Sequence, residues 1–427
     1  MLNDTYVQLA FGSLIMLVSY VLLRRVKYLK LKEPPLVPYK YPIIGHTNDF
    51  YKDNKNFIKK CHAEYGEIFS LFVFGKVITF NFPFENFLNR PNEFTDTFPK
   101  MVQINLSGQI KLYTERVQRQ LIKSIDEMIG NVKFDYPINP NYISFRTSFK
   151  ILSIYHAKPI AATMVGEELS DDKELVNSFA NVTTDFIPFL SISPVLNFIH
   201  PYLHQQVMII ITPVIEKRLR EMKESGDNYV SPIDILQRYT ELLHKDYTVD
   251  IDVVTDYMII SIFASVHTTS NFLTFCLHEL VNNPQFLKEI LEEQEQLYKS
   301  NEKSYYSTEQ IARMEKLDSF IKETLRVNVN NVALQHKTLS SYFTFSNGYQ
   351  VPKGRLVNIV QEKFIQIKNY KVNMLMNLRV SILEKEFTSN TRRQSFLTFG
   401  LGKHTCPGRH FAVNEIKLTL HYLLLKY

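Results

Sequence analysis

A glycine-rich loop near the end of the chain carries the residue best suited to bind a metal. It reads FLTFGLGKHTCPGRHF from Phe396 to Phe411, with a cysteine at position 406. A cysteine binds a metal as its thiolate, whereas a free thiol has a pKa of about 8.5. We expect a helix from Gly408 to Lys426, whose free N–H groups point back at the sulfur and favour the anion. The loop therefore predicts a thiolate ligand; the alternative is a buried cysteine in a turn.

The neighbours of Cys406 suit a flat macrocycle. Positive φ values and a close approach of a ring to the backbone are permitted by three glycines, Gly400, Gly402 and Gly408. Phe399 can stack over such a ring and keep water from the sulfur. His404 can form a hydrogen bond with a propionate of the ring.

A threonine in a long apolar helix is the second candidate for chemistry. The pattern from Asp252 to Leu280 contains no Pro or Gly and is apolar almost all round, which predicts a helix that crosses the middle of a domain. Within it, the hydroxyl of Thr268 can bond the carbonyl one turn back and open the helix locally. His267 titrates near neutrality and can relay protons. The alternative is a threonine that only satisfies its own hydroxyl.

A glutamate and an arginine form the third candidate. Glu323 and Arg326, in the run KETLR, lie three residues apart on one helix face and can pair. An exposed pair of this kind contributes only about 0.3–0.5 kcal/mol. Both readings stay open here: a surface pair, or a support for the cysteine loop.

The composition of the 427 residues excludes several classes of protein. Hydrophobic residues make up 45%, which suffices for a large core. The formal net charge of +6 comes from scattered basic residues, so nucleic acid is not an expected partner, whereas a membrane surface or an acidic protein is. The three cysteines, Cys61, Cys276 and Cys406, are far apart and predict neither a disulfide framework nor a zinc site.

The first 32 residues predict a membrane anchor. The segment from Tyr6 to Leu23 is uncharged, and about 18 helical residues span roughly 27 Å, close to the thickness of the hydrocarbon layer. Basic residues follow at once, which puts the body of the protein on the cytoplasmic side. Residues 33–46 carry four prolines and read as a stiff hinge, and residues 47–427 form the catalytic domain. The alternative is an apolar core helix.

The rest of the chain reads as mainly helical with small β pieces. A hairpin is expected around Gly75 and Lys76, and short strands within 338–360. Gly66 and Gly226 are expected to end helices. Helices are expected at Phe57–Tyr65, Leu112–Ile129, Ile160–Met164, Leu175–Phe186, Gln205–Met222, Gln285–Lys299 and Thr308–Arg326.

The cysteine loop and the order of these elements resemble the cytochrome P-450 family of heme-thiolate monooxygenases, with the fungal membrane-bound class the nearest. The likeness covers nearly the whole chain: anchor, hinge, hairpin, long helix, Glu-x-x-Arg helix and cysteine loop. It implies a mainly α fold, a helical prism with small β-sheets. It also implies heme b as the cofactor, with Cys406 as the axial ligand of the iron, and O2 as the co-substrate.

The resemblance further implies roles for single residues. Thr268 would lie over the iron and pass protons to bound dioxygen, with His267 where the family usually has an acid. The pair of Glu323 and Arg326 would be buried behind the heme. Two further matches are Arg379, as a third partner of that pair, and His336, which would reach a propionate unless it is a surface histidine.

By the same resemblance, the protein would insert one oxygen atom of O2 into an apolar small molecule such as a lipid, terpenoid or sterol-like compound. Electrons would come from NADPH through an NADPH–cytochrome reductase that docks near Lys403 and Arg409. The chain would be a single-pass protein of the endoplasmic reticulum membrane. Two alternatives are a heme-thiolate isomerase that needs no reductase, and a degenerate membrane-tethered member with little or no catalysis.

Departures from the family pattern favour the degenerate alternative. The chain contains no tryptophan, and the family's Trp/Arg-bearing helix is not recognisable between Thr97 and Thr114. The stretch from Phe364 to Arg393 lacks the usual His, Pro and Phe landmarks. The sequence ends at Tyr427 without the terminal β hairpin that normally lines the substrate pocket.

Overall fold

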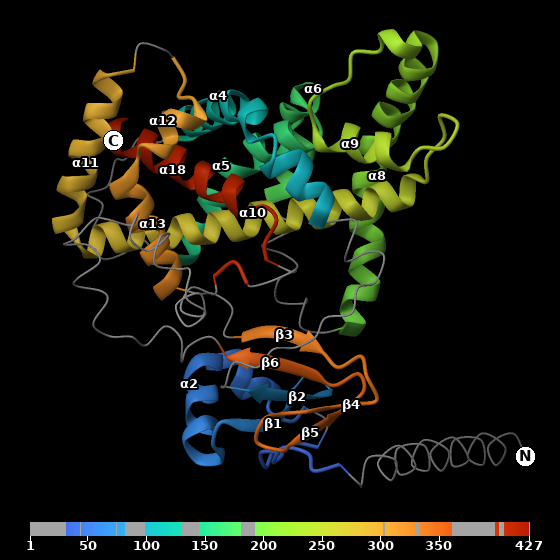
Figure 1. Ribbon diagram of the computed structural model, residues 1–427, viewed down its shortest axis with the longest axis vertical. Helices are drawn as coiled ribbons and strands as arrows, with labels where there is room; N and C mark the ends of the chain where they lie inside the picture. The colour runs from blue at the N-terminus through green and yellow to red at the C-terminus, as the bar shows by residue number, and fades with distance from the viewer. Residues whose placement is uncertain are drawn as a thin grey trace, which may run out of the picture. The chain divides into compact units, whose positions relative to one another are not determined.

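The computed structural model describes residues 31–42, 44–73, 75–81, 99–129, 145–180, 193–301, 304–328, 333–360, 398–400 and 405–426. They fall into two compact units, one within Met1–Arg90 and Asn331–Lys363, the other within Pro91–Asn330 and Phe364–Tyr427 (Figure 1). The predicted anchor lies outside the described residues, so the boundaries after residues 32 and 46 remain predictions.

The first unit is a helix with two small sheets. Helix α2 (Thr47–Tyr65) ends at Gly66, whose φ of 84° is open to glycine without strain. The larger sheet has the order β1-β2-β6-β3, with β2 and β6 parallel and the other pairs antiparallel. The strands are β1 (Ile68–Val73), β2 (Lys76–Asn81), β3 (Ala333–Lys337) and β6 (Leu356–Val360), and the smaller sheet pairs β4 (Tyr342–Thr344) with β5 (Gln350–Pro352).

The hairpin predicted around Gly75 is confirmed, with Val73 opposite Lys76. Its alternating apolar residues face α2 and form the core of this unit, where Phe69 stacks on Phe80 with ring centroids 5.7 Å apart. The short strands predicted within 338–360 are confirmed as well, and β3 adds a strand that the sequence did not suggest.

The second unit is helical. Its elements in chain order are η1, a π-helix (Gln103–Ser107), α4 (Ile110–Ile129), α5 (Phe145–Met164), α6 (Glu167–Ser170), α8 (Ser193–Ser225), η2 (Gly226–Asn228), α9 (Ile235–Leu243), α10 (Ile251–Asn282), α11 (Pro284–Lys299), α12 (Thr308–Ala312), α13 (Glu315–Val327) and α18 (Arg409–Lys426). Together with the small sheets of the first unit, they confirm the predicted mainly α fold.

Helix α10 runs through the middle of this unit, as its apolar pattern predicts. It packs against α5, α8, α9, α11, α13 and α18 (Figure 1). Within the described part of the chain it is the one helix long and apolar enough to cross a bilayer, a property that core helices share. Its burial here accounts for that composition.

The helix predicted from Thr308 to Arg326 is in fact two helices, and that prediction is wrong. The chain breaks at Arg313 and Met314, between α12 and α13. The cause lies on α11: the carboxylate of Glu293 accepts hydrogen bonds from the backbone N–H groups of Lys316 (2.7 Å) and Leu317 (3.1 Å). A side chain from another helix thus caps the start of α13, which has no cap of its own.

Three helices begin well before their predicted starts, and one of them is α2, which begins at Thr47 rather than Phe57. Helix α5 begins at Phe145 rather than Ile160 and continues through Pro159, and α8 begins at Ser193 rather than Gln205. An interior proline removes one N–H donor. Packing of α5 against both α4 and α10 outweighs this loss.

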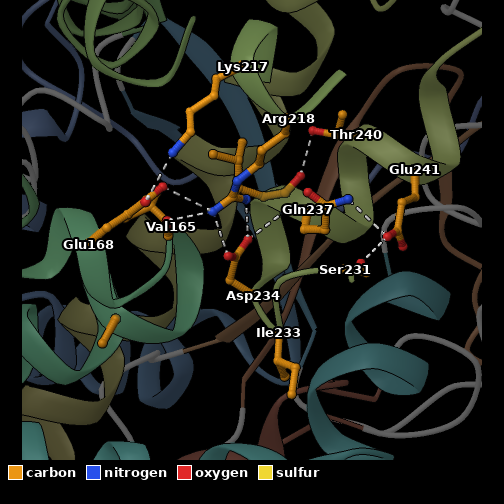
Figure 2. A network of polar contacts seen from close by, with 12 residues as sticks. Val165, Glu168, Lys217, Arg218, Ser231, Ile233, Asp234, Gln237, Thr240 and Glu241 are labelled. Atoms are coloured by element: carbon orange, nitrogen blue, oxygen red, sulfur yellow. Dashed lines mark hydrogen bonds and ion pairs between the residues drawn. The ribbon is translucent and has the colours of Figure 1, made fainter. Parts of the chain in front are cut away.

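An ion pair inside the second unit joins α8 to the start of α9 (Figure 2). The guanidinium of Arg218 donates two hydrogen bonds of 2.8 Å to the carboxylate of Asp234, and both side chains are almost fully buried. The same carboxylate caps α9 by accepting the N–H of Gln237 at 2.7 Å. The carboxylate of Asp234 therefore both balances the charge of Arg218 and caps the start of α9.

Candidate functional site

The cysteine loop closes on itself just before the last helix. Cys406 is half-buried, and its backbone N–H donates to the carbonyl of Phe399 at 2.7 Å. Gly400 has a φ of 73°, which is the conformation expected of a glycine in this loop. Gly402 and His404 lie outside the described residues, so their roles remain predictions.

The start of α18 directs hydrogen-bond donors at the sulfur of Cys406. Burial raises the pKa of this thiol, while the backbone N–H groups of Gly408 and Arg409 and the charge of Arg409 act in the opposite direction. The guanidinium of Arg409 also donates to the carbonyl of Cys406 at 3.0 Å. Full ionisation of the thiol needs a further positive charge, which a bound metal ion provides.

Hydroxyl groups tie the loop down on both sides of the cysteine. Thr398 donates to the carbonyl of Leu325 on α13 at 3.1 Å, and Ser107 of η1 donates to the carbonyl of Pro407 at 2.5 Å. Neither contact has a local signal in the sequence, because Ser107 lies 300 residues from its acceptor and Thr398 lies 73 residues from its own. They hold Cys406 between α13 and η1.

Gly408 leaves room beside the cysteine. Its φ is not positive, so that part of the prediction is wrong. Apart from its neighbours in the chain, a Cβ atom built at this position would meet no heavy atom of the described residues within 4 Å, although the residue is half-buried. This free space next to a thiol fits the close approach of a flat ring, which is the second reason for a glycine here.

The middle of α10 exposes two side chains one turn apart, and the helix is continuous there. Thr268 and Ala264 are exposed, whereas Val266 and Thr269 between and beside them are buried. The hydroxyl of Thr268 donates to the carbonyl of Ala264 at 2.6 Å, as predicted. Since α10 also packs against α18, a helix that begins at the cysteine loop, this exposed face of α10 is a candidate for the oxygen side of the site.

The prediction that His267 titrates near neutrality is wrong. Its imidazole is half-buried on α10, and this burial lowers its pKa to about 4. The ring is therefore neutral at pH 7. It can take part in a proton path as a neutral donor and acceptor, but not by carrying the charge.

Glu323 and Arg326 form a bidentate pair on α13. The Nε and Nη2 atoms of Arg326 donate to the two carboxylate oxygens of Glu323 at 2.8 and 2.7 Å. The side chains are only 12% and 5% exposed, so this is not a surface pair. The same helix carries the Leu325 carbonyl that holds Thr398, which links the pair to the cysteine loop. Arg379 lies outside the described residues.

His336 lies in the first unit. It is half-buried on β3, opposite Val357 of β6. The sequence patterns had suggested no strand at this position. Its expected contact with a propionate remains a prediction.

A helix that starts at a cysteine loop, with a long central helix packed beside it, is the arrangement expected of heme-thiolate proteins. Comparison with known proteins agrees: the family model described as Cytochrome P450 matches residues 106–363 and 383–427. The chain belongs to the cytochrome P450 family. Membership implies heme b as the cofactor and O2 as the co-substrate.

Curated relatives are fungal. Cytochrome P450 monooxygenase 71 of Postia placenta is 32% identical over 228 residues, which cover 51% of this chain and 44% of the relative. Cytochrome P450 monooxygenase atmQ of Aspergillus flavus is 27% identical over 338 residues, 74% of this chain and 61% of the relative. Cytochrome P450 monooxygenase paxQ of Penicillium paxilli is 28% identical over 323 residues, which cover 71% of this chain and 62% of the relative. The chain thus spans about half of the length of the relatives that it matches.

Proposed function

We propose that this protein is a heme-thiolate monooxygenase that inserts one oxygen atom of O2 into an apolar small molecule. The observation that carries the proposal is the half-buried thiol of Cys406, with two backbone N–H groups and a guanidinium acting on it at the start of α18. The printed names of the fungal relatives, all monooxygenases, support the reaction type.

In this proposal Cys406 holds the iron, and the N–H groups of Gly408 and Arg409 donate to its sulfur. Such donors withdraw charge from the thiolate and tune the potential of the metal. Bound heme supplies the chemistry that activates dioxygen. Thr398 and Ser107 fix the loop, and Phe399 shields the sulfur from water.

On the opposite side, Thr268 holds a proton at its hydroxyl. That hydroxyl now donates to the carbonyl of Ala264, and its exposed position leaves its oxygen able to accept a bond from water. Water ordered there passes protons inward. His267, neutral because it is buried, orients the neighbouring polar groups without adding charge.

The proposed partners follow from the family and from the sequence. An NADPH–cytochrome reductase supplies electrons and docks near Lys403 and Arg409. The anchor at residues 1–32 and the hinge at 33–46 hold the catalytic domain on the cytoplasmic face of the endoplasmic reticulum, and a lipid, terpenoid or sterol-like substrate enters from the bilayer.

The ligand assignment is tested by the spectrum of the reduced carbon monoxide adduct of the full chain. We expect the strongly red-shifted Soret band of a thiolate-bound heme, and its loss in Cys406→Ser. The matched control is Cys276→Ser, because Cys276 is fully buried on α10 away from the loop and should keep the band. An unchanged band in Cys406→Ser would overturn the assignment. Product formation that depends on NADPH and reductase separates a monooxygenase from an isomerase.

A further inference from the structure

A second cavity lies far along α18 from the cysteine loop. It has a volume of about 560 Å³ and lies between α4, α11 and α18. Leu121, Leu291 and Leu418 form its apolar wall. The volume falls within the ~300–1,000 Å³ of small-molecule sites. His421, which also lines it, is 12 residues beyond Arg409, roughly 18 Å along the helix.

His421 presents a hydrogen-bond acceptor in this cavity. Its Nδ1 lies 2.8 Å from Oε1 of Gln294, whose Nε2 donates to Glu293. The amide oxygen of Gln294 therefore accepts, and Nδ1 of His421 carries the proton. Burial lowers the pKa of His421 to about 4, so the ring is neutral and Nε2 has a lone pair. Among the described residues, none donates to Nε2.

The polar wall around His421 is held in place by the protein. The ring of Tyr306 meets that of His421 edge-on, with centroids 4.6 Å apart. The backbone of Tyr306 is fixed in turn by the buried side chain of Gln118, which accepts its N–H at 2.8 Å and donates to its carbonyl at 2.7 Å. The acceptor is therefore positioned before any ligand arrives.

The charged residues at the rim are already paired. Lys426 donates to Asp126 at 2.5 Å and to the hydroxyl of Tyr422 at 2.8 Å. Glu295 lies 3.6 Å from Lys299. The cavity thus offers an apolar wall and one neutral acceptor, and no charged group is left over to bind an ionised ligand.

We propose that this cavity binds an apolar alcohol, whose hydroxyl donates to Nε2 of His421 while its hydrocarbon body covers the leucine wall. The inference goes beyond the proposed monooxygenase activity, since no step at Cys406 enters it. It assigns to the chain a second small-molecule site.

The absence of tryptophan makes a local reporter simple to build. In the full chain, Tyr298→Trp places one tryptophan at the cavity wall, and Tyr51→Trp places one on the exposed side of α2 as a matched control. Menthol and its ketone menthone serve as probes, because they share a carbon skeleton and only menthol donates. We expect menthol to change the fluorescence of Tyr298→Trp alone and to bind about fivefold more tightly than menthone.

Adding His421→Phe to the Tyr298→Trp reporter should abolish the preference for menthol over menthone. Adding Cys406→Ser instead should leave that preference intact. The two variants therefore distinguish failure of the heme assignment from failure of this site. Ile122→Trp narrows the cavity from α4 and keeps His421. Because the proposed active site also takes terpenoids, calorimetry compares this variant with the unaltered chain, and both probes should bind the narrowed cavity more weakly. Equal affinities in the reporter, a preference that survives His421→Phe, or undiminished menthol binding in Ile122→Trp would overturn the proposal.

Discussion

The buried ion pair of Arg218 and Asp234 allows a prediction whose size follows from the structure (Figure 2). The perturbation is Asp234→Asn. It removes the negative charge but keeps a side-chain oxygen that can still accept the N–H of Gln237 at the start of α9. Arg218 then stays buried, and among the described residues the carboxylate left to balance its charge is Glu168, at 3.7 Å and half exposed.

Removing one partner of a buried pair costs about 3–5 kcal/mol. Because Glu168 balances part of the charge, we expect Asp234→Asn to lower the free energy of unfolding of the second unit by about 3 kcal/mol. Asp234→Ala also removes the cap of α9 and should cost about 1 kcal/mol more. Adding Arg218→Met to Asp234→Asn removes the unbalanced charge and should recover most of the loss.

Urea unfolding followed by far-UV circular dichroism measures these differences by linear extrapolation. The matched control is Glu115→Gln, which breaks an exposed pair with Arg119 on α4 and should cost about 0.5 kcal/mol or less. A cost below about 1 kcal/mol for Asp234→Asn would refute the reasoning, because Glu168 would then balance the charge of Arg218 fully. The absence of recovery in the double variant would also refute it, because the unbalanced charge would then not be the cause of the loss.

Three further predictions concern the site and its supports. Gly408→Ala should leave the melting temperature unchanged, since its Cβ meets no atom of the residues that the structure describes beyond its chain neighbours, but should reduce the heme content after expression. A normal heme content would show that no ring approaches this residue. Thr268→Ala should keep the Soret band of the carbon monoxide adduct and lower the product formed per NADPH consumed; unchanged coupling would remove Thr268 from the proton path. Burial raises the pKa of Asp318, but the charges of Lys417 and Lys322 outweigh this effect and hold the pKa below its ordinary value. The stability that this carboxylate contributes is therefore fully present above its unfolded pKa of about 4, and it is lost as the pH falls through the lower folded pKa. Asp318→Asn should flatten acid unfolding in that range, and an unchanged acid limb would contradict this role.

Several elements of both units could be predicted because their signals are local. The apolar pattern of α10 has no internal proline or glycine, and the helix extends only one or two residues beyond the predicted ends. The hairpin of β1 and β2 follows from β-rich runs around Gly75. The start of α18 after Cys406 follows from the Pro-Gly pair.

The features that sequence reasoning missed depend on contacts between distant segments. The break before α13 depends on Glu293, which belongs to another helix. The low pKa of His267 depends on burial that no residue type reveals. The hydrogen bond from Ser107 to the carbonyl of Pro407 joins residues that lie 300 positions apart in the sequence. Local propensity carries none of these, because each is decided when helices pack together.

The cap that Glu293 gives to α13 has a consequence for the order in which the chain folds. A short helix without a cap of its own is a poor nucleus, since its first turn fixes many dihedral angles for few hydrogen bonds. Helix α13 therefore gains its start only when α11 has docked. The Leu325 carbonyl, which accepts the hydrogen bond from Thr398, reaches its final position only after α11 has docked. If Cys406 binds the heme as proposed, the cofactor is captured only after the helical body has assembled.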